Sequence, residues 1–292
     1  MSIDRWLDKN THSLSGKTVA ISGATGGIGR ELCRHLTRLG ASLILLDRNM
    51  ERSHALADSL RADFPTAEIS HIRVDMEDIS SVTAAADSLL DMPVDYLILN
   101  AGAYSIPRHK CTTGYDNVFQ INFISPYYLA ARLLPSIKAR NGKVIAVGSI
   151  AHRYSKTDEK DVDFSTRHKA SLVYGNAKRH LMFSLPQLSD DGSVVIAHPG
   201  ITFTNITAHY PRLIFAIIKH PMKIIFMSPR KAGLCILQGI FQNHGDREWI
   251  GPGIFDVWGY PCVKKLRSVD NSEIIRIRQT ATKIYNDITN IH

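Results

Sequence analysis

Short apolar runs alternate with longer segments of helical spacing from residue 17 to about residue 200. The runs are rich in Val, Ile and Leu and hold few polar residues, which is typical of parallel strands covered by helices on both faces. They span residues 17–22, 41–46, 67–74, 94–100, 142–149 and 193–199. This order predicts an α/β fold of Rossmann type: a doubly wound, mainly parallel sheet of about seven strands.

The segments between the runs carry apolar residues on one helical face. In the first of them, Ile28, Leu32 and Leu36 share a face and Gly40 supplies a stop signal. The same spacing predicts helices at residues 50–63, 79–90, 114–139, 171–188, 229–243 and 271–289. Because repeats and Gly/Ser linkers are absent, we expect one domain over residues 1–292, with extensions at 1–15 and 244–292.

Composition adds mainly exclusions. Of 292 residues, 44% are hydrophobic and 21% charged, as in ordinary globular proteins. No run reaches the ~18 apolar residues of a spanning helix and no secretory signal opens the chain, so a cytoplasmic protein is expected. The net charge of +8 is spread out and no zinc-finger or RNA-binding signature accompanies it, so no nucleic-acid partner is expected. Histidine and cysteine spacings fit no metal site, and we predict no metal.

A glycine-rich turn joins the first run to the first helix. Gly23, Gly27 and Gly29 lie where the unpaired N–H groups and the positive dipole end of a helix attract a phosphate. Asp47 ends the second run, where a carboxylate receives the ribose hydroxyls of a dinucleotide. Its charge would repel the 2′-phosphate of NADP, whereas the neighbouring Arg48 could pair with that phosphate. The cofactor expected is therefore NAD, with NADP as the alternative.

With these residues the chain resembles the short-chain dehydrogenase/reductase family over residues 16 to about 243. The family's turn T-G-x-x-x-G-x-G is matched by "SGATGGIG", in which Ser22 keeps the hydroxyl of the usual Thr. The family's N-N-A-G motif is matched by "LNAG", in which Leu99 replaces the first Asn. The resemblance implies an NAD(P)-binding Rossmann domain. It assigns further cofactor contacts to Ile28, Asp75, Asn100, Ala101 and Gly102.

The resemblance also implies a catalytic set of Asn122, Ser149, Tyr174 and Lys178. The last two residues would contact the cofactor as well, with Lys178 on the nicotinamide ribose and Asn122 holding a water of a proton relay. The segment "HPGITFT" fits P-G-x-x-x-T, which places Pro199, Gly200 and Thr204 beside the nicotinamide. The four catalytic residues occur in family order, and this order makes coincidence a poor explanation.

Elementary chemistry gives Tyr174 and Lys178 a function together. A tyrosine with a pKa of about 10 is a poor base at neutral pH. Lys178 lies four residues further along the predicted helix, on the same face, and its ammonium would stabilise phenolate. Ser149, at the end of the fifth run, can hold a substrate oxygen. We expect Tyr174 to be the acid/base of a hydride-transfer reaction between nicotinamide and an alcohol or carbonyl.

The long separation of Ser149 from Tyr174 resembles the retinol-dehydrogenase-like subgroup and favours a lipophilic substrate. In the family, residues 201–228 would form the substrate loop. Its part 210–227 is apolar but broken by Lys219, His220, Pro221 and Lys223, so it suits either a pocket lid or a peripheral membrane contact.

Two other functions remain open from the sequence. One is a non-catalytic, nucleotide-binding regulatory protein. The other is a nucleotide-sugar epimerase or dehydratase, because Gly23, Gly26 and Gly29 also satisfy G-x-x-G-x-x-G. The predicted helix at 271–289 would cover the pocket or contact a second copy in a homo-oligomer.

Overall fold

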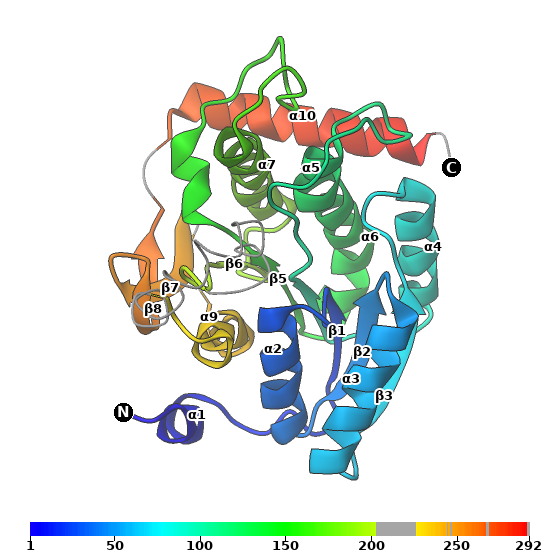
Figure 1. Ribbon diagram of the computed structural model, residues 1–292, viewed down its shortest axis with the longest axis vertical. Coiled ribbons are helices and arrows are strands. Elements are labelled where there is room, and N and C mark those ends of the chain that lie inside the picture. Colours follow the sequence, from blue (N-terminus) through cyan, green and yellow to red (C-terminus); the bar gives the residue numbers. More distant parts are fainter. Residues whose placement is uncertain (203–225, 244, 246, 267–268, 291–292) are drawn as a thin grey trace, which may run out of the picture.

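The computed structural model describes residues 1–202, 226–243, 245, 247–266 and 269–290. In this part of the chain eight strands form one sheet, in the order β3-β2-β1-β4-β5-β6-β7-β8 (Figure 1). Neighbouring strands are parallel except for β7 and β8. The strands are β1 Thr18–Ser22, β2 Ser42–Asp47, β3 Ile69–Arg73, β4 Tyr96–Leu99, β5 Lys143–Val147, β6 Val194–Ala197, β7 Glu248–Ile254 and β8 Trp258–Lys265. The predicted Rossmann-type, mainly parallel sheet is confirmed.

Helices cover both faces of the sheet. The helices are α1 Ile3–Asn10, α2 Gly27–Arg38, α3 Met50–Asp63, α4 Ile79–Leu90, α5 Asn117–Phe119, α6 Ser125–Ala139, α7 Ala170–Ser184, α9 Pro229–Phe241 and α10 Asn271–Thr289. One apolar core joins α2, α3 and α9 to the sheet, with Leu36 and Leu237 among its buried residues. A second core joins α4, α6, α7 and α10, and includes Leu133 and Leu181. The runs of Val, Ile and Leu are therefore buried from both sides.

The helix predicted at 114–139 has a different shape in the structure. It begins at Asn117, and a π-helical turn, η1 (Gln120–Ile124), lies between α5 and α6. Such turns insert a residue into a helix and commonly occur at functional sites. The turn contains Asn122, whose side chain it directs toward the strand ends.

Both predicted extensions pack on the sheet's helices. In the N-terminal extension, α1 buries Trp6 and Leu7, and Trp6 stacks on Tyr260 of β8. In the C-terminal extension, β7 and β8 form an antiparallel hairpin, and α10 lies across α7 with Ile277 and Ile284 buried (Figure 1). The helix that contains Tyr174 and Lys178 is thus held between the sheet and α10.

Candidate active site

A cavity of about 440 Å³ opens at the carboxyl ends of the parallel strands. This edge is where open α/β sheets bind their ligands. The cavity lining includes ten of the predicted cofactor residues: Gly23, Gly27, Ile28, Gly29, Asp47, Arg48, Asp75, Asn100, Ala101 and Gly102. The structure therefore brings the predicted adenosine and phosphate contacts together in one place.

The glycine turn has the geometry that a phosphate group requires. Gly23 has φ +67°, and a Cβ on Gly29 would lie 2.3 Å from the carbonyl oxygen of Gly23. Helix α2 begins after Gly26, which provides no side-chain cap for the first N–H groups of the helix. Uncapped N–H groups at a helix N-terminus that lines a cavity fit an anionic dinucleotide.

Hydrogen bonds tie the ends of β1 and β4 together under this cavity. The hydroxyl of Ser22 accepts from the backbone N–H groups of Asn100 and Ala101, at 3.1 and 3.0 Å. The side-chain amide of Asn100 donates to the carbonyl oxygens of Ser22 and Gly23, at 3.1 and 2.9 Å. The hydroxyl that Ser22 shares with the family's Thr therefore fixes the loop after β4.

Asp47 is buried at the end of β2. Its carboxylate accepts from the N–H and hydroxyl of Thr25, at 3.2 and 3.0 Å, and from the hydroxyl of Ser53, at 3.1 Å. Burial raises the pKa of Asp47, and the bonds from Thr25 and Ser53 partly offset that effect. The side chain of Arg48 is 63% exposed, and its Nη1 lies 3.8 Å from Asp75 and 3.6 Å from Glu77.

Tyr174 and Ser149 meet at the same edge of the sheet. The Ser149 side chain lies beside the Tyr174 hydroxyl, and the ring of Tyr104 packs edge-on against Tyr174, with centroids 5.4 Å apart. Burial raises the pKa of Tyr174 to about 12, although the neighbouring Ser149 hydroxyl lowers it. The phenol is therefore protonated at neutral pH.

Lys178 is 2% exposed, and its Nζ lies 5.7 Å from the centroid of the Tyr174 ring. The Nζ donates to the carbonyl oxygen of Val147 at 2.9 Å, and burial lowers the pKa of Lys178 to about 7. The lysine thus lies one helical turn from the tyrosine, as the four-residue spacing predicts.

Asn122 and Lys178 both lie close to Gly102, on the side where a Cβ would point. A Cβ on Gly102 would lie 2.8 Å from Oδ1 of Asn122 and 3.7 Å from Nζ of Lys178. The Asn122 side chain donates to the carbonyls of Ala103 and Val118, both at 2.8 Å, and accepts from the N–H of Ala103 at 3.3 Å. The π-helical turn therefore uses Asn122 to hold the backbone that follows "LNAG".

The predicted nicotinamide contacts follow β6. Gly200 has φ +81°, and a Cβ there would lie 2.8 Å from the carbonyl oxygen of Val257, so the hairpin β7–β8 packs against this segment. Pro199 and Gly200 are at the carboxyl edge of the sheet but do not line the cavity described above. Thr204 lies outside the described residues, as does segment 210–227 apart from Phe226 and Met227.

Some neighbours of the site were not predicted from the sequence. Tyr104 is the second residue after "LNAG", and that position after a motif was the available signal. Thr25 lies inside the glycine turn itself. Arg179 and Glu273 also meet behind the site, but they are 94 residues apart and carry no local signal.

Comparisons with known proteins agree with this geometry. A family model described as short chain dehydrogenase matches residues 17–158. A retinol dehydrogenase 12 of Mus musculus is 31% identical over 202 residues, covering 66% of this chain and 64% of that protein. The chain belongs to the short-chain dehydrogenase/reductase family. The expected likeness to its retinol-dehydrogenase-like members is confirmed.

A second short-chain dehydrogenase/reductase relative and a solved structure extend the comparison. The short chain dehydrogenase rstn4 of Aspergillus nomiae is 34% identical over 225 residues, covering 66% of this chain and 61% of that protein. The chain thus spans less than two thirds of the length of these two relatives. The crystal structure of an uncharacterised protein from Mycobacterium paratuberculosis has a TM-score of 0.70 and 22% identity, and covers 96% of this chain and 95% of that one. It shares the fold.

These matches do not favour the regulatory or epimerase alternatives. Within the described ranges, no group of three or more His, Cys, Asp or Glu side chains is arranged to hold a metal ion. In the same ranges no helix is both long and apolar enough to cross a bilayer.

Proposed function

We propose that this protein is an NAD(P)-dependent alcohol dehydrogenase or carbonyl reductase. One observation carries the proposal: Ser149, Tyr174 and Lys178 lie together at the same edge of the sheet as the cavity lined by the glycine turn. The three residues do not themselves line that cavity. A bound nicotinamide would supply or accept the hydride. The protein would supply the group that binds the substrate oxygen. It would also give a proton to that oxygen, or take one from it in the reverse direction.

Tyr174 is the proposed acid/base. With its pKa raised to about 12 by burial, the phenol keeps its proton and can donate it to a carbonyl oxygen that is being reduced. In the reverse direction Tyr174 must lose that proton, and the nearby ammonium of Lys178 stabilises the phenolate. Ser149 donates to the same oxygen and so holds the substrate at the tyrosine.

Asn122 and Lys178 have proposed positioning roles. Lys178 would bond the nicotinamide ribose. Its ammonium has three N–H donors, so it can donate to a ribose hydroxyl while it keeps its bond to the Val147 carbonyl. Asn122 fixes the Ala103 backbone beside Lys178, where a water would complete a proton relay. Gly102 leaves the space between them free of a side chain.

We propose NAD as the preferred cofactor. Asp47 lines the cavity at the expected ribose position, and Asp75 and Glu77 add carboxylates to the same wall. Arg48 lies within 3.8 Å of both of these acids, so its charge is partly neutralised before any 2′-phosphate arrives. A 2′-phosphate would meet more negative than positive charge.

A lipophilic alcohol or aldehyde is the proposed substrate class, by analogy with the retinol dehydrogenase relative. The aromatic ring of Tyr104 beside Tyr174 suits an apolar group next to the reacting carbon. Two further predictions from the sequence stay predictions. They are a peripheral membrane contact through residues 210–227 and the formation of a homo-oligomer.

The test is a screen of alcohols and carbonyls of increasing chain length, each with NAD(H) and NADP(H), followed by the absorbance of the reduced nicotinamide. Turnover that rises with apolar chain length supports the proposal. Binding of either cofactor without turnover of any alcohol or carbonyl would instead support the nucleotide-binding regulatory protein.

A further inference from the structure

Arg179 directly follows Lys178 on α7, and its guanidinium is buried. Nε and Nη2 donate to the two carboxylate oxygens of Glu273 on α10, at 2.7 and 2.6 Å, and Nη1 donates to the backbone carbonyl of His152 at 2.9 Å. The side chains of Arg179 and Glu273 are 8% and 9% exposed. One guanidinium therefore connects α10 with the turn that follows Ser149.

Glu273 also binds the loop that leads from this turn to α7. Its Oε1 accepts from the backbone N–H and the hydroxyl of Thr157, at 2.9 and 3.1 Å. Burial alone would raise the pKa of Glu273, but the bonds from Arg179 and Thr157 lower it to about 2. The carboxylate is thus ionised and fully bonded at neutral pH.

The turn after Ser149, residues Ile150–Tyr154, packs closely on α7. A Cβ on Gly175 would lie 2.4 Å from the carbonyl oxygen of Ala151, so no side chain separates the turn from the helix. The ring Nδ1 of His152 lies 2.6 Å from the carbonyl oxygen of Ser149. The contact between turn and helix therefore determines where Ser149 lies relative to Tyr174.

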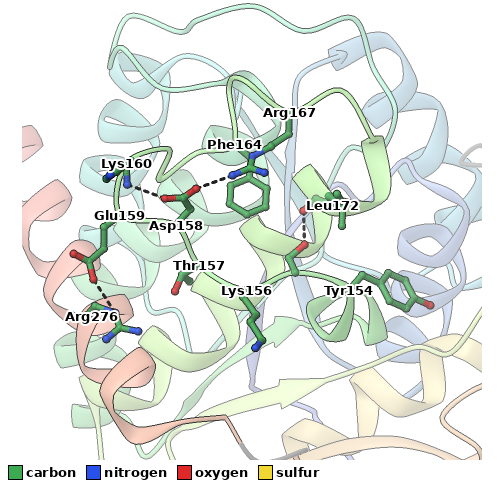
Figure 2. Close-up of a pocket in the computed structure, with 11 residues that line it drawn as sticks. Tyr154, Lys156, Thr157, Asp158, Glu159, Lys160, Phe164, Arg167, Leu172 and Arg276 are labelled. Atoms are coloured by element: carbon green, nitrogen blue, oxygen red, sulfur yellow. Dashed lines mark hydrogen bonds and ion pairs between the residues drawn. The ribbon is translucent and has the colours of Figure 1, made fainter.

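Exposed ion pairs hold the outer side of the same loop. Figure 2 shows Glu159 turned toward Arg276 of α10, and Asp158 toward Arg167, at the rim of a cavity of about 560 Å³. The two pairs measure 3.0 and 2.6 Å. The side chains of Arg276 and Glu159 are 42% and 75% exposed, so solvent screens their interaction.

Stability is a weak reason for burying a charge pair, because apolar residues of similar volume are often as stable. We propose that Glu273 is a positioning residue of the active site. Through Arg179 and Thr157, it holds the turn after Ser149 against α7 and thereby sets where Ser149 lies relative to Tyr174. The inference rests on the proposed oxidoreductase function, in which that placement aligns the acid/base with the substrate oxygen.

The decisive variant replaces both charges by apolar side chains, Arg179→Met together with Glu273→Leu. We expect a folded protein whose KM for the cofactor stays within about twofold and whose kcat falls roughly 10- to 100-fold, as misplacement of a reacting group causes. Assays are run well below the unfolding midpoint of each variant. A double variant with wild-type kcat would overturn the proposal, because the pair would then serve stability alone.

Arg179→Lys keeps a buried cation but loses the fork that reaches both Glu273 and His152. We expect it to fold and to show a reduced kcat with an unchanged KM for the cofactor; an unchanged kcat would contradict the positioning role. Arg276→Gln is the matched control, because it removes an exposed ion pair between the same helix and loop. Its kcat should equal that of the wild type.

Hydrogen exchange of the cofactor-free protein separates this inference from the proposed function. In the double variant, amides of residues 150–157 should exchange faster while those of β5 stay protected. Unchanged exchange at 150–157 would refute the role of Glu273 even if the wild type turned over no substrate. Absence of turnover by the wild type would refute the proposed function alone.

Discussion

The ammonium of Lys178 donates to the carbonyl oxygen of Val147, 2.9 Å away, so α7 is bonded to the last residue of β5. This bond joins the helix that contains Tyr174 to the strand that leads to Ser149. Burial of the side chain, and not this bond, lowers the pKa of Lys178 to about 7. The bond therefore sets the position of the lysine, whereas its burial favours the neutral form.

Replacing Tyr174 by Phe should abolish turnover and leave cofactor binding nearly intact. The change removes only the hydroxyl, which carries the transferred proton in the proposed reaction, and keeps the ring that packs against Tyr104. Rates with an active alcohol and the dissociation constant of the cofactor measure the two effects. Tyr154→Phe is the control, because that ring is 55% exposed. A Tyr174→Phe variant with wild-type kcat would exclude the assigned acid/base.

The stability of the cofactor-free protein should depend on Lys178 in alkaline solution. Its folded pKa of about 7 lies below the usual value of 10.5, so between these values the unfolded chain binds a proton that the folded chain lacks. The free energy of unfolding must therefore rise with pH in this window, by at most about 1.4 kcal/mol per pH unit. Urea titrations of the wild type and Lys178→Met at several pH values from 7 to about 10 measure the effect.

The difference between the wild type and Lys178→Met cancels the contributions of all other titrating groups. Below pH 7 the two curves should run parallel, since the lysine is then charged in both states. A difference that stays constant over the whole window would mean that the buried ammonium keeps an ordinary pKa.

Gly29→Ala should damage the glycine turn. The new Cβ would lie 2.3 and 2.7 Å from the carbonyl oxygens of Gly23 and Ala24, so the turn must open. We expect a loss of about 1–3 kcal/mol in unfolding free energy and greatly weakened cofactor binding. Thermal melting and calorimetric titration measure these. Gly26→Ala places its Cβ 3.3 Å from the nearest atom, so its melting temperature should lie closer to that of the wild type than that of Gly29→Ala does.

Asp47→Ser should change the cofactor preference. Serine removes the charge that repels a 2′-phosphate, so kcat/KM should fall for NAD and rise for NADP. The ratio of the NAD value to the NADP value should fall about tenfold or more, which corresponds to about 1.4 kcal/mol. Steady-state kinetics with both cofactors give the ratio. Asp58→Ser, at an exposed carboxylate of α3, should leave it unchanged. An unchanged NAD/NADP ratio in Asp47→Ser would mean that Asp47 does not determine the cofactor preference.

Features encoded in short stretches could be predicted from the sequence. The apolar runs identified six strands, and α3 and α4 begin and end at the residues predicted for them. The glycine turn could be predicted because a strand, glycines and an amphipathic helix follow one another. The pair Tyr174 and Lys178 could be placed on one face because helical spacing alone determines that.

Features that depend on contacts between distant segments could not be predicted. The π-helical turn at Asn122 leaves the apolar periodicity almost unchanged, so it was included in one helix over 114–139. Ser53 binds Asp47 only after α3 packs on β2. Arg179 and Glu273 look like surface charges in the sequence, and only the docking of α10 on α7 buries them.

The distance of Glu273 along the chain affects when the site is completed during synthesis. Ninety-four residues separate it from Arg179. At 5–20 residues per second, a ribosome needs roughly 5–20 s to add them. In that interval a nascent chain already contains the glycine turn and all four motif residues, yet Arg179 still lacks its carboxylate. Full activity would therefore be acquired late in translation, when α10 emerges and docks.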